Sequence, residues 1–437
     1  MTFDDAVSYL LSLGHETLTI KLGLANTERL LAALGNPHKS FSSVQIAGTN
    51  GKGSTAVMLE SICREARISV GLFTSPHLIS ITERIRVNGA DIAKDEFARL
   101  TKHVKQTAEE LVERRELQSL PTFFEHVTAI ALLAFREAEV ELAILETGLG
   151  GRLDSTTAAG AQVVAITPIA MDHEEFLGST LAEIAAEKAA TIRPGVTTIV
   201  APQPDEALEV IEARCGELGV KARFVSAPTN VTVAEDSVPG RMCATFETRN
   251  DRYENVCLGL RGRHQAINAA TTVVIAEGLG ERGFDLSRHL ILSGLKNARH
   301  PGRLELLDGT PPVLLDGAHN PAAALALHDY LEEFVDQPIT LIFGAMRDKP
   351  LSEIAGILFP AARQVILTEL DNPRAATLEN LKAAAPSGLD QTSLHEAKSV
   401  AEALQIARRV TGPDGLILIT GSLYLVGAVQ QSIRRNV

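Results

Sequence analysis

The chain has 437 residues, a length that predicts two domains because one domain ordinarily holds about 100–200 residues. Hydrophobic residues make up 45% of it and charged residues 22%, which is the usage of folded proteins and excludes an intrinsically disordered chain. Aromatic residues make up only 4%, and the formal net charge is −13 at pH 7, so we expect no binding to nucleic acid through stacked bases or neutralised phosphates.

Short apolar runs alternate with helical patterns over most of the first 200 residues. Strands are predicted at 44–47, 70–73, 81–87, 142–145, 163–167 and 197–200. Helices are predicted between them at 54–67, 124–138 and 181–192. Strands that alternate with helices of this length are typical of βαβ units, so the pattern predicts an α/β protein whose parallel sheet is covered on both faces.

The same pattern begins again near the end of the chain. Strands are predicted at 312–315, 339–343, 365–367 and 416–419, with a helix at 321–334. The stretch 294–302 is rich in Gly, Pro and basic residues, and few contacts are expected to cross such a linker. We therefore expect a first domain over 1–296 and a smaller second domain over 297–437, with a cleft between them.

The cysteines and the start of the chain bear on its compartment. Cys63, Cys215, Cys243 and Cys257 show no C-x-x-C spacing, so neither a thiolate zinc site nor a disulfide framework is expected. Residues 1–5 are acidic, unlike a signal peptide, and no segment approaches the ~18 unbroken apolar residues of a membrane span. These features predict a soluble cytoplasmic protein without a membrane partner.

The strongest motif lies between the strand 44–47 and the helix that follows it. Its residues are Gly48, Thr49, Asn50, Gly51, Lys52, Gly53, Ser54 and Thr55. Glycines let the backbone fold around phosphate oxygens, the helix N-terminus adds partial positive charge, and Lys52 adds a full charge. The spacing departs from G-x-x-x-x-G-K-[ST], which leaves open a plain glycine-rich turn, but the order strand, turn, helix favours a nucleotide site with ATP as its ligand.

A nucleoside triphosphate needs a hard cation such as Mg²⁺ with oxygen ligands. Glu146 follows the strand 142–145, at the edge of a parallel sheet where ligands bind, and His173 follows another strand. Taken alone, Glu146 is equally compatible with a helix cap, and His173 is more often structural than a ligand. Lys188 lies in the helix 181–192, and its pattern alone favours an ordinary solvated ammonium.

Taken together, these segments resemble the folylpolyglutamate synthase/dihydrofolate synthase family, a branch of the Mur ligase superfamily. The matching segments are spread over the chain at 48–54, 73–78 (FTSPHL), 83–89 (ERIRVNG), 145–154, 172–178 (DHEEFLG), 184–188, 194–195 and 315–321 (LDGAHNP). The first segment alone indicates only the superfamily. The order and spacing of all of them indicate the folate branch.

The resemblance implies a P-loop ATPase-like parallel-sheet domain followed by a smaller Rossmann-like α/β domain. It implies that Mg²⁺ binds to Ser75, Glu146 and His173, and that Lys188 carries a carbamate, which replaces a cation by an anion near the metal. Further implied contacts to ATP are Asn268, Arg303 and Asp316. The implied contacts to the pterin substrate are Thr122, Phe123, Phe124, Glu125, Leu153, Asp154 and Ser155.

The implied activity is the ATP-dependent addition of L-glutamate to dihydropteroate, to the γ-glutamyl tail of reduced folates, or to both. A carboxylate is a poor acylating agent, so ATP first converts it into an acyl phosphate, which the neutral α-amino group of glutamate attacks. The expected catalytic residues are Lys52, Lys188, Asp316 and His319, with His319 close to glutamate or the acyl phosphate. Domain closure would bring Asp316 and Arg303 to the nucleotide and keep water from the intermediate. The enzyme is expected to be a monomer.

Three alternatives remain open at this point. A peptidoglycan-precursor Mur ligase would share the nucleotide loop, but the segments 74–78 and 145–154 argue against it. A regulatory P-loop protein without ligase chemistry would form no ADP in response to glutamate. A degenerate homologue would bind ligands without turnover, and the retention of the candidate catalytic residues argues against it. The sequence also leaves open the balance between the two folate reactions.

Overall fold

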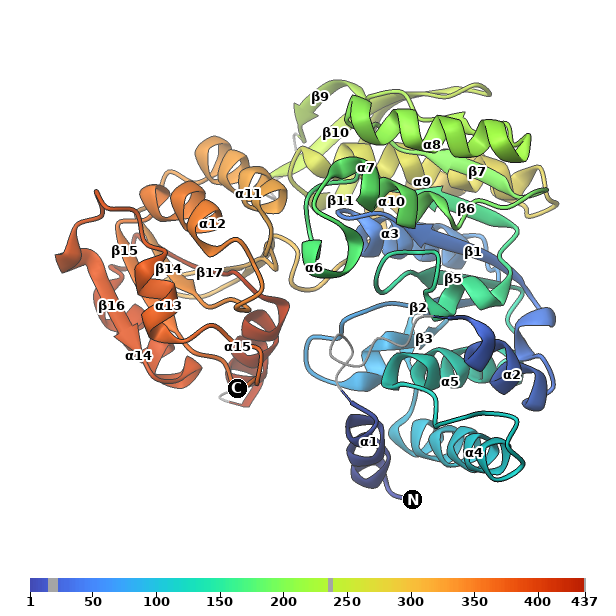
Figure 1. Ribbon diagram of the computed structural model, residues 1–437. Coiled ribbons are helices and arrows are strands. Elements are labelled where there is room, and N and C mark those ends of the chain that lie inside the picture. Colours follow the sequence, from blue (N-terminus) through green and yellow to red (C-terminus); the bar gives the residue numbers. More distant parts are fainter. Residues whose placement is uncertain (15–22, 235–238, 436–437) are drawn as a thin grey trace.

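The structure is a computed structural model that describes residues 1–14, 23–234 and 239–435 (Figure 1). Its first sheet has eight strands among these residues, in the order β4-β3-β2-β5-β1-β6-β7-β8. They are β1 (Ser42–Ala47), β2 (Val70–Phe73), β3 (Ile85–Val87), β4 (Ala90–Asp91), β5 (Leu142–Glu146), β6 (Val163–Ile166), β7 (Thr197–Val200) and β8 (Arg223–Phe224). Neighbouring strands are parallel except at β2–β3 and β3–β4, and the central strands are buried, as in a sheet covered on both faces.

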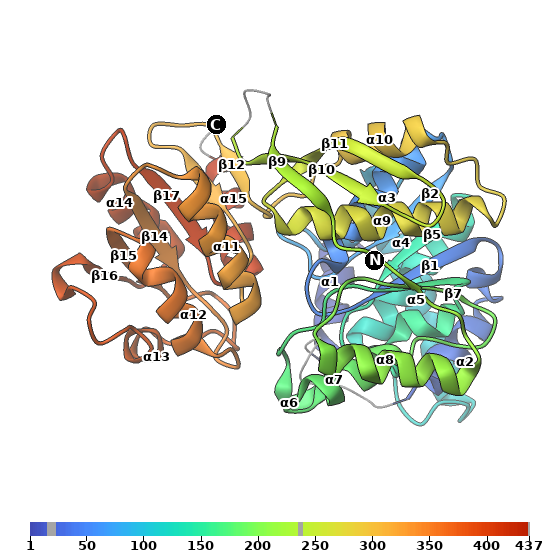
Figure 2. The ribbon, with the colours of Figure 1, turned by 90° about the horizontal axis from the view of Figure 1, so that it is seen from above.

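Helices cover both faces of this sheet, as Figures 1 and 2 show. On one face, the apolar side chains of α3 (Lys52–Glu65), α9 (His264–Gly280) and α10 (Arg288–Asn297) form a core with the strands. On the other face, α1 (Phe3–Ser12), α2 (Ala25–Ala33), α4 (Lys94–Glu113) and α5 (Phe123–Glu137) pack over β2 and β5. The helices α6 (Glu174–Leu177), α7 (Leu181–Ala189) and α8 (Asp205–Leu218) cover β6 and β7 on that same face.

A small antiparallel sheet, which the sequence did not predict, packs beside α9 and α10 (Figure 2). Its order is β11-β10-β9, with β9 (Thr229–Val233), β10 (Arg241–Glu247) and β11 (Arg252–Arg261). Cys243 and Cys257 are direct partners in the register of β10 and β11, and a disulfide joins them. The expectation that the chain has no disulfide is therefore wrong for this pair. The register of a hairpin brings the two sulfur atoms together, and the 14-residue separation does not reveal that register.

The second parallel sheet is formed by residues after 304. Its described strands follow the order β12-β13-β17-β14-β15-β16, with only β12 antiparallel to its neighbour. They are β12 (Glu305–Leu307), β13 (Val313–Leu315), β14 (Ile339–Phe343), β15 (Gln364–Thr368), β16 (Leu394–Ala397) and β17 (Leu416–Thr420). One face is covered by α11 (Pro321–Phe334), α12 (Leu351–Leu358) and α13 (Leu378–Ala383), and the other by α14 (Val400–Val410) and α15 (Leu423–Arg435).

The predicted α/β class, with a parallel-sheet part followed by a second α/β part, is confirmed. The strand predicted over 81–87 is only half right, because residues 81–84 form a 3₁₀ helix capped by Ser80 and only 85–87 extend as β3. The linker predicted at 294–302 is also partly wrong, because α10 continues to Asn297. A Cβ on Gly294 would lie 2.4 Å from the Cα of Ile62, so this helix packs closely on α3.

In the part of the chain that the structure describes, no helix combines the length and the apolar character that crossing a bilayer requires.

Candidate active site

A cavity of about 860 Å³ lies between the two parallel sheets, where loops after β1, β2, β5 and β6 face loops after β13, β14 and β17. This is the edge at which α/β proteins bind ligands. The candidate residues that line it are Gly48, Thr49, Asn50, Gly51, Lys52, Gly53, Ser54, Ser75, Thr122, Phe124, Glu125, Glu146, Leu153, Asp154, Ser155, His173, Lys188, Asn268, Arg303, Asp316 and His319. Two candidates do not line it: Thr55 is fully buried within α3, and Phe123 packs beneath the guanidinium of Arg84.

The loop between β1 and α3 needs glycine at two positions. Gly48 and Gly51 have φ angles of 142° and 87°, in the region that favours glycine. A Cβ on Gly48 would lie 1.9 Å from Thr167 Oγ1, and one on Gly51 would lie 2.1 Å from Asn268 Oδ1. The first turn of α3 opens into the cavity, where its N–H groups and helix dipole attract an anion. The loop therefore has the form and polarity of a phosphate site.

Two lysines share one acceptor in this loop. Lys52 Nζ donates to the carbonyl oxygens of Gly48 and Thr49, at 3.1 Å each. Lys188 Nζ, from α7, donates to the same Gly48 oxygen at 2.9 Å. Burial lowers the pKa of both lysines, and the pKa of Lys188 falls to about 7, with repulsion from Lys52 as the next cause. At neutral pH a large fraction of Lys188 is therefore a neutral amine.

Glu146 and Ser75 meet where β5 and β2 end. Burial raises the pKa of the Glu146 carboxyl, and its Oε2 accepts a hydrogen bond from the backbone N–H of Ser75 at 3.1 Å. His173 has a pKa lowered by burial to about 3, and its Nδ1 is buried without a hydrogen-bond partner among the described residues. A carboxylate, a hydroxyl and a neutral imidazole fit a divalent cation whose other ligands are phosphate and water oxygens. Within the described ranges, no three His, Cys, Asp or Glu side chains form a metal site by themselves.

In the segments predicted to bind the pterin, several polar side chains form hydrogen bonds within the segment itself or with neighbouring loop residues. Thr122 and Glu125 form a capping box: the Glu125 N–H donates to Thr122 Oγ1 at 3.3 Å, and the Thr122 N–H donates to Glu125 Oε2 at 2.7 Å. Asp154 Oδ2 accepts hydrogen bonds from the backbone N–H groups of residues 148–149, at 2.9 and 3.1 Å. These carboxylates shape the wall of the cavity, and Phe124 supplies an aromatic surface on it.

The second sheet contributes Asp316 at the end of β13. Its two carboxylate oxygens accept hydrogen bonds from the backbone N–H groups of Leu304 and Ala318, at 2.9 Å each. Leu304 directly follows Arg303, so Asp316 fixes the segment that presents Arg303 to the cavity. A histidine that the sequence analysis did not single out lies on the same segment. His300 Nδ1 is 3.2 Å from Ser54 Oγ, so this segment also contacts the phosphate loop.

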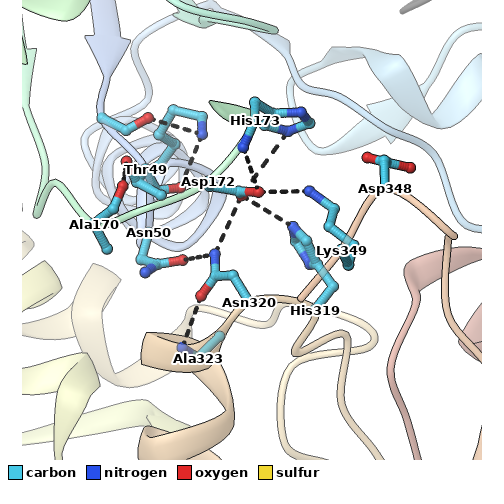
Figure 3. Close-up of polar contacts among 12 residues, drawn as sticks. Thr49, Asn50, Ala170, Asp172, His173, His319, Asn320, Ala323, Asp348 and Lys349 are labelled. Carbon is cyan, nitrogen blue, oxygen red and sulfur yellow. Dashed lines mark hydrogen bonds and ion pairs between the residues drawn. The ribbon is translucent and has the colours of Figure 1, made fainter. Parts of the chain in front are cut away.

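Asp172 connects the two parts of the molecule, and the sequence analysis did not select it (Figure 3). Its Oδ1 lies 2.5 Å from Lys349 Nζ, and its Oδ2 accepts from Asn320 Nδ2 at 3.2 Å and lies 3.6 Å from His319 Nε2. Asn320 Nδ2 also donates to Asn50 Oδ1 at 3.0 Å. Burial alone would raise the pKa of Asp172, but the contact with His319 and the surrounding positive charges outweigh burial and hold the pKa well below its usual range.

The sequence contained a signal for some of these missed residues. Asp172 opens the segment 172–178 and Asn320 lies in 315–321, two segments that were recognised for their order and spacing only. Lys349 belongs to no motif, and nothing in its neighbourhood of the sequence distinguishes it from a surface lysine.

Comparisons with known proteins agree with this arrangement. The Mur ligase middle domain matches residues 46–276, and the Mur ligase glutamate ligase domain matches residues 302–423. A dihydrofolate synthase/folylpolyglutamate synthase of Bacillus subtilis is 35% identical, over 99% of this chain and 99% of that protein. A probable bifunctional folylpolyglutamate synthase/dihydropteroate synthase of Haloferax volcanii is 38% identical over 100% of this chain, which spans only 51% of that longer protein. Escherichia coli FolC in complex with DHPP and ADP superposes with a TM-score of 0.87 and 29% identity, covering 100% of this chain and 98% of FolC.

Proposed function

The chain belongs to the folylpolyglutamate synthase/dihydrofolate synthase family of Mur ligases, and we propose that it adds L-glutamate both to dihydropteroate and to the γ-glutamyl tail of reduced folates. Enzymes of this family are ATP-dependent ligases that form C–N bonds. The observation that carries the proposal is the cavity shared by the phosphate loop, the segments 122–125 and 153–155, and Asp316 with Arg303. A nucleotide, a pterin acid and an amino acid can meet there.

The phosphate loop would hold ATP against the first turn of α3. Lys52 would exchange its two backbone acceptors for phosphate oxygens, and Arg303 would add positive charge from the side of the second sheet. Ser75, Glu146 and His173 would hold Mg²⁺, which when bound offsets charge on the phosphate oxygens. The structure of FolC in complex with ADP supports a nucleotide as a ligand of this chain.

The reaction would proceed through an acyl phosphate. The acceptor carboxylate attacks the γ-phosphorus of ATP and releases ADP, and the neutral amino group of glutamate then attacks the acyl carbon and releases phosphate. Catalysis of phosphoryl transfer depends mainly on positioning the reactants and stabilising the charge on the phosphoryl oxygens, and the loop and Lys52 would do both. Phe124 would contact the pterin acid, and the FolC complex with DHPP supports such a pocket. His319, beside Asp172, would lie close to the entering glutamate.

Lys188 would act as a carbamate, because its buried neutral amine can add CO₂. The gap between the two family matches, from 276 to 302, supports two domains over 1–296 and 297–437 that close on the substrates.

Product analysis tests this function directly. The protein is incubated with ATP, Mg²⁺ and glutamate, with dihydropteroate or tetrahydrofolate offered separately, and the products are identified by mass. We expect a glutamate adduct of each acceptor together with ADP, and no ADP release from Lys52→Ala. Glutamate-independent ADP release, or a product formed only from a UDP-linked muramyl precursor, would overturn the proposal.

A further inference from the structure

Residues 74–80, the loop that follows β2 and carries Ser75, are held by two side chains of the segment 83–89. The carboxylate of Glu83 accepts hydrogen bonds from three consecutive backbone N–H groups, those of residues 78–80, at 2.7, 3.0 and 2.7 Å. The buried Arg84 donates from Nε to His77 Nδ1 at 2.8 Å. These bonds connect the loop to the segment 83–89 from His77 onward, and the proposed reaction uses neither Glu83 nor Arg84.

Leu78, at the centre of this loop, packs into the hydrophobic core of the other part of the molecule. That core, the C-terminal apolar cluster, lies between the second sheet and helices α14 and α15. Its members are Leu315, Ile342, Met346, Ile366, Leu370, Ala397, Ala403, Leu404, Ala407, Ile417, Ile419, Leu425, Val426 and Val429. The half-buried side chain of Leu78 packs against this cluster. A Cβ on Gly302 would lie 3.1 Å from Val426 and 3.3 Å from both Leu78 methyl groups.

The backbone of Leu78 is also in close contact with α15. A Cβ on Gly427 would lie 1.9 Å from the carbonyl oxygen of Leu78 and 2.7 Å from its carbonyl carbon. Gly427 is within the helix and needs no unusual φ angle. The close approach of the two backbones is therefore the reason that a side chain does not fit at residue 427.

One short segment thus connects the two parts through opposite ends. At one end the N–H of Ser75 donates to Glu146 in the first sheet, and three residues later Leu78 is fixed against α15. We propose that Leu78 is a positioning residue that couples the docking of the second sheet to the placement of Ser75 beside Glu146, and that Gly427 permits this contact. The proposal rests on the proposed function only where activity is measured.

The coupling predicts an effect that a purely structural leucine would not have. Leu78→Ala removes the side chain from the cluster, and Gly427→Ala pushes the Leu78 carbonyl away from α15. Both variants should release the loop and disorder one end of the cation site. Residues that orient metal ligands from outside change metal affinity by about 10- to 100-fold, so we expect a weakening of about tenfold in Mn²⁺ binding in the presence of ADP.

The matched control is Leu404→Ala, which removes the same side chain from α14 in the same cluster. Three measurements are made on each protein: the thermal midpoint, Mn²⁺ binding with ADP by electron paramagnetic resonance, and hydrogen exchange of residues 74–84. We expect all three variants to lower the midpoint. Only Leu78→Ala and Gly427→Ala should weaken Mn²⁺ binding and speed the exchange of amides 78–80, and both should lose kcat.

The proposal is wrong if Leu78→Ala lowers the midpoint as Leu404→Ala does while Mn²⁺ binding and loop exchange stay at the wild-type level. If Leu78→Ala does not fold, Leu78→Val is measured instead and should show the same pattern with a smaller effect, whereas Leu78→Met should retain wild-type binding. The binding and exchange measurements decide the coupling even if the wild-type protein shows no ligase activity, so the two proposals can fail separately.

Discussion

The buried amine of Lys188 gives the sharpest test of the site chemistry. Its Nζ donates a hydrogen bond to the carbonyl oxygen of Gly48 at 2.9 Å. Lys52 Nζ donates to the same oxygen. Burial and the neighbouring charge of Lys52 lower the pKa of Lys188 from 10.5 to about 7. Only a neutral amine adds CO₂, by forming an N–C bond and releasing one proton, so we predict that this environment favours carbamylation of Lys188.

The size of the effect follows from the two pKa values. At pH 7, a lysine with a pKa of about 7 is roughly half neutral, whereas a lysine at 10.5 is neutral in only about one molecule in 3,000. The reactive fraction of Lys188 is therefore raised on the order of a thousandfold. Between pH 7 and 10.5 the unfolded chain binds more protons at this residue than the folded chain does, so stability rises with pH through that window. Below pH 7 the protein is destabilised by the full free-energy cost of burying the charged Lys188 ammonium, and Lys188→Met removes that cost.

The assay is carbon-13 NMR of the protein in ¹³C-bicarbonate at pH 6, 7 and 8. We expect a carbamate resonance that grows as pH rises through about 7, since the neutral amine does. The resonance should vanish in Lys188→Met. The matched control is Lys349→Met, which removes another buried lysine of the cavity. Lys349 is ion-paired with Asp172 at 2.5 Å and should not react, so this variant should keep the resonance.

Activity supplies the second part of the test. ADP formation with folate acceptor and glutamate should fall in buffer depleted of CO₂ and return when bicarbonate is added. Lys188→Met should be slow in both buffers. If the rate does not depend on bicarbonate and no resonance is assigned to Lys188, the inference that burial leads to carbamylation of this lysine is refuted.

Three further changes test other features of the structure. Gly48→Ala places a Cβ 1.9 Å from Thr167 Oγ1 on a left-handed backbone, and we expect weaker ADP binding by calorimetry and a loss of at least ~1–3 kcal/mol in urea unfolding. Cys243→Ser opens a disulfide that spans 14 residues and should cost about 3 kcal/mol; dithiothreitol should bring the wild-type protein to the same value. Asp172→Asn leaves the buried ammonium of Lys349 without its counter-ion and should cost about 3–5 kcal/mol, whereas an unchanged unfolding midpoint would show that this pair does not hold the two parts together.

Local patterns explain what the sequence could predict. The strands 339–343 and 197–200 and the helix 321–334 have the bounds that the apolar runs and the Asn320-Pro321 start indicate. The phosphate loop was predictable for the same reason, because its glycines and lysine lie within eight consecutive residues. Each of these features depends on neighbours in the chain, and the composition of a short window reports them.

Some residues that were predicted to contact the substrate have side chains that form local hydrogen bonds in the structure. Thr122 and Glu125 match a substrate segment, yet their side chains close the first turn of α5. The spacing T-x-x-E has the same letters in either role, so the sequence could not separate them. The carboxylate of Asp154 likewise accepts hydrogen bonds from backbone N–H groups of its own loop. Phe124, in contrast, lines the cavity with an aromatic ring that can contact a ligand without breaking such bonds.

Contacts between the two parts lay beyond the sequence. Asp172 and Lys349 are 177 residues apart, and their pairing depends on how the second sheet docks on the first. The contact between Leu78 and Gly427 depends on the same docking, and Gly427 carries no turn or left-handed angle that would mark it. No periodicity or motif in the sequence predicts these contacts, because they depend on how the surfaces of the two complete parts fit together.

The lysine pair at Gly48 connects the loop that the sequence predicted to the docking that it did not. Two ammonium groups on one carbonyl oxygen repel each other where little solvent screens them, and burial together with this repulsion lowers the pKa of Lys188 to about 7. Glu146 and Asp172 act in the opposite direction on Lys52, since both carboxylates favour its charged form. Because Asp172 favours the charged form of both lysines and is placed by its bonds to Lys349 and Asn320, the docking of the second sheet also affects the pKa of both.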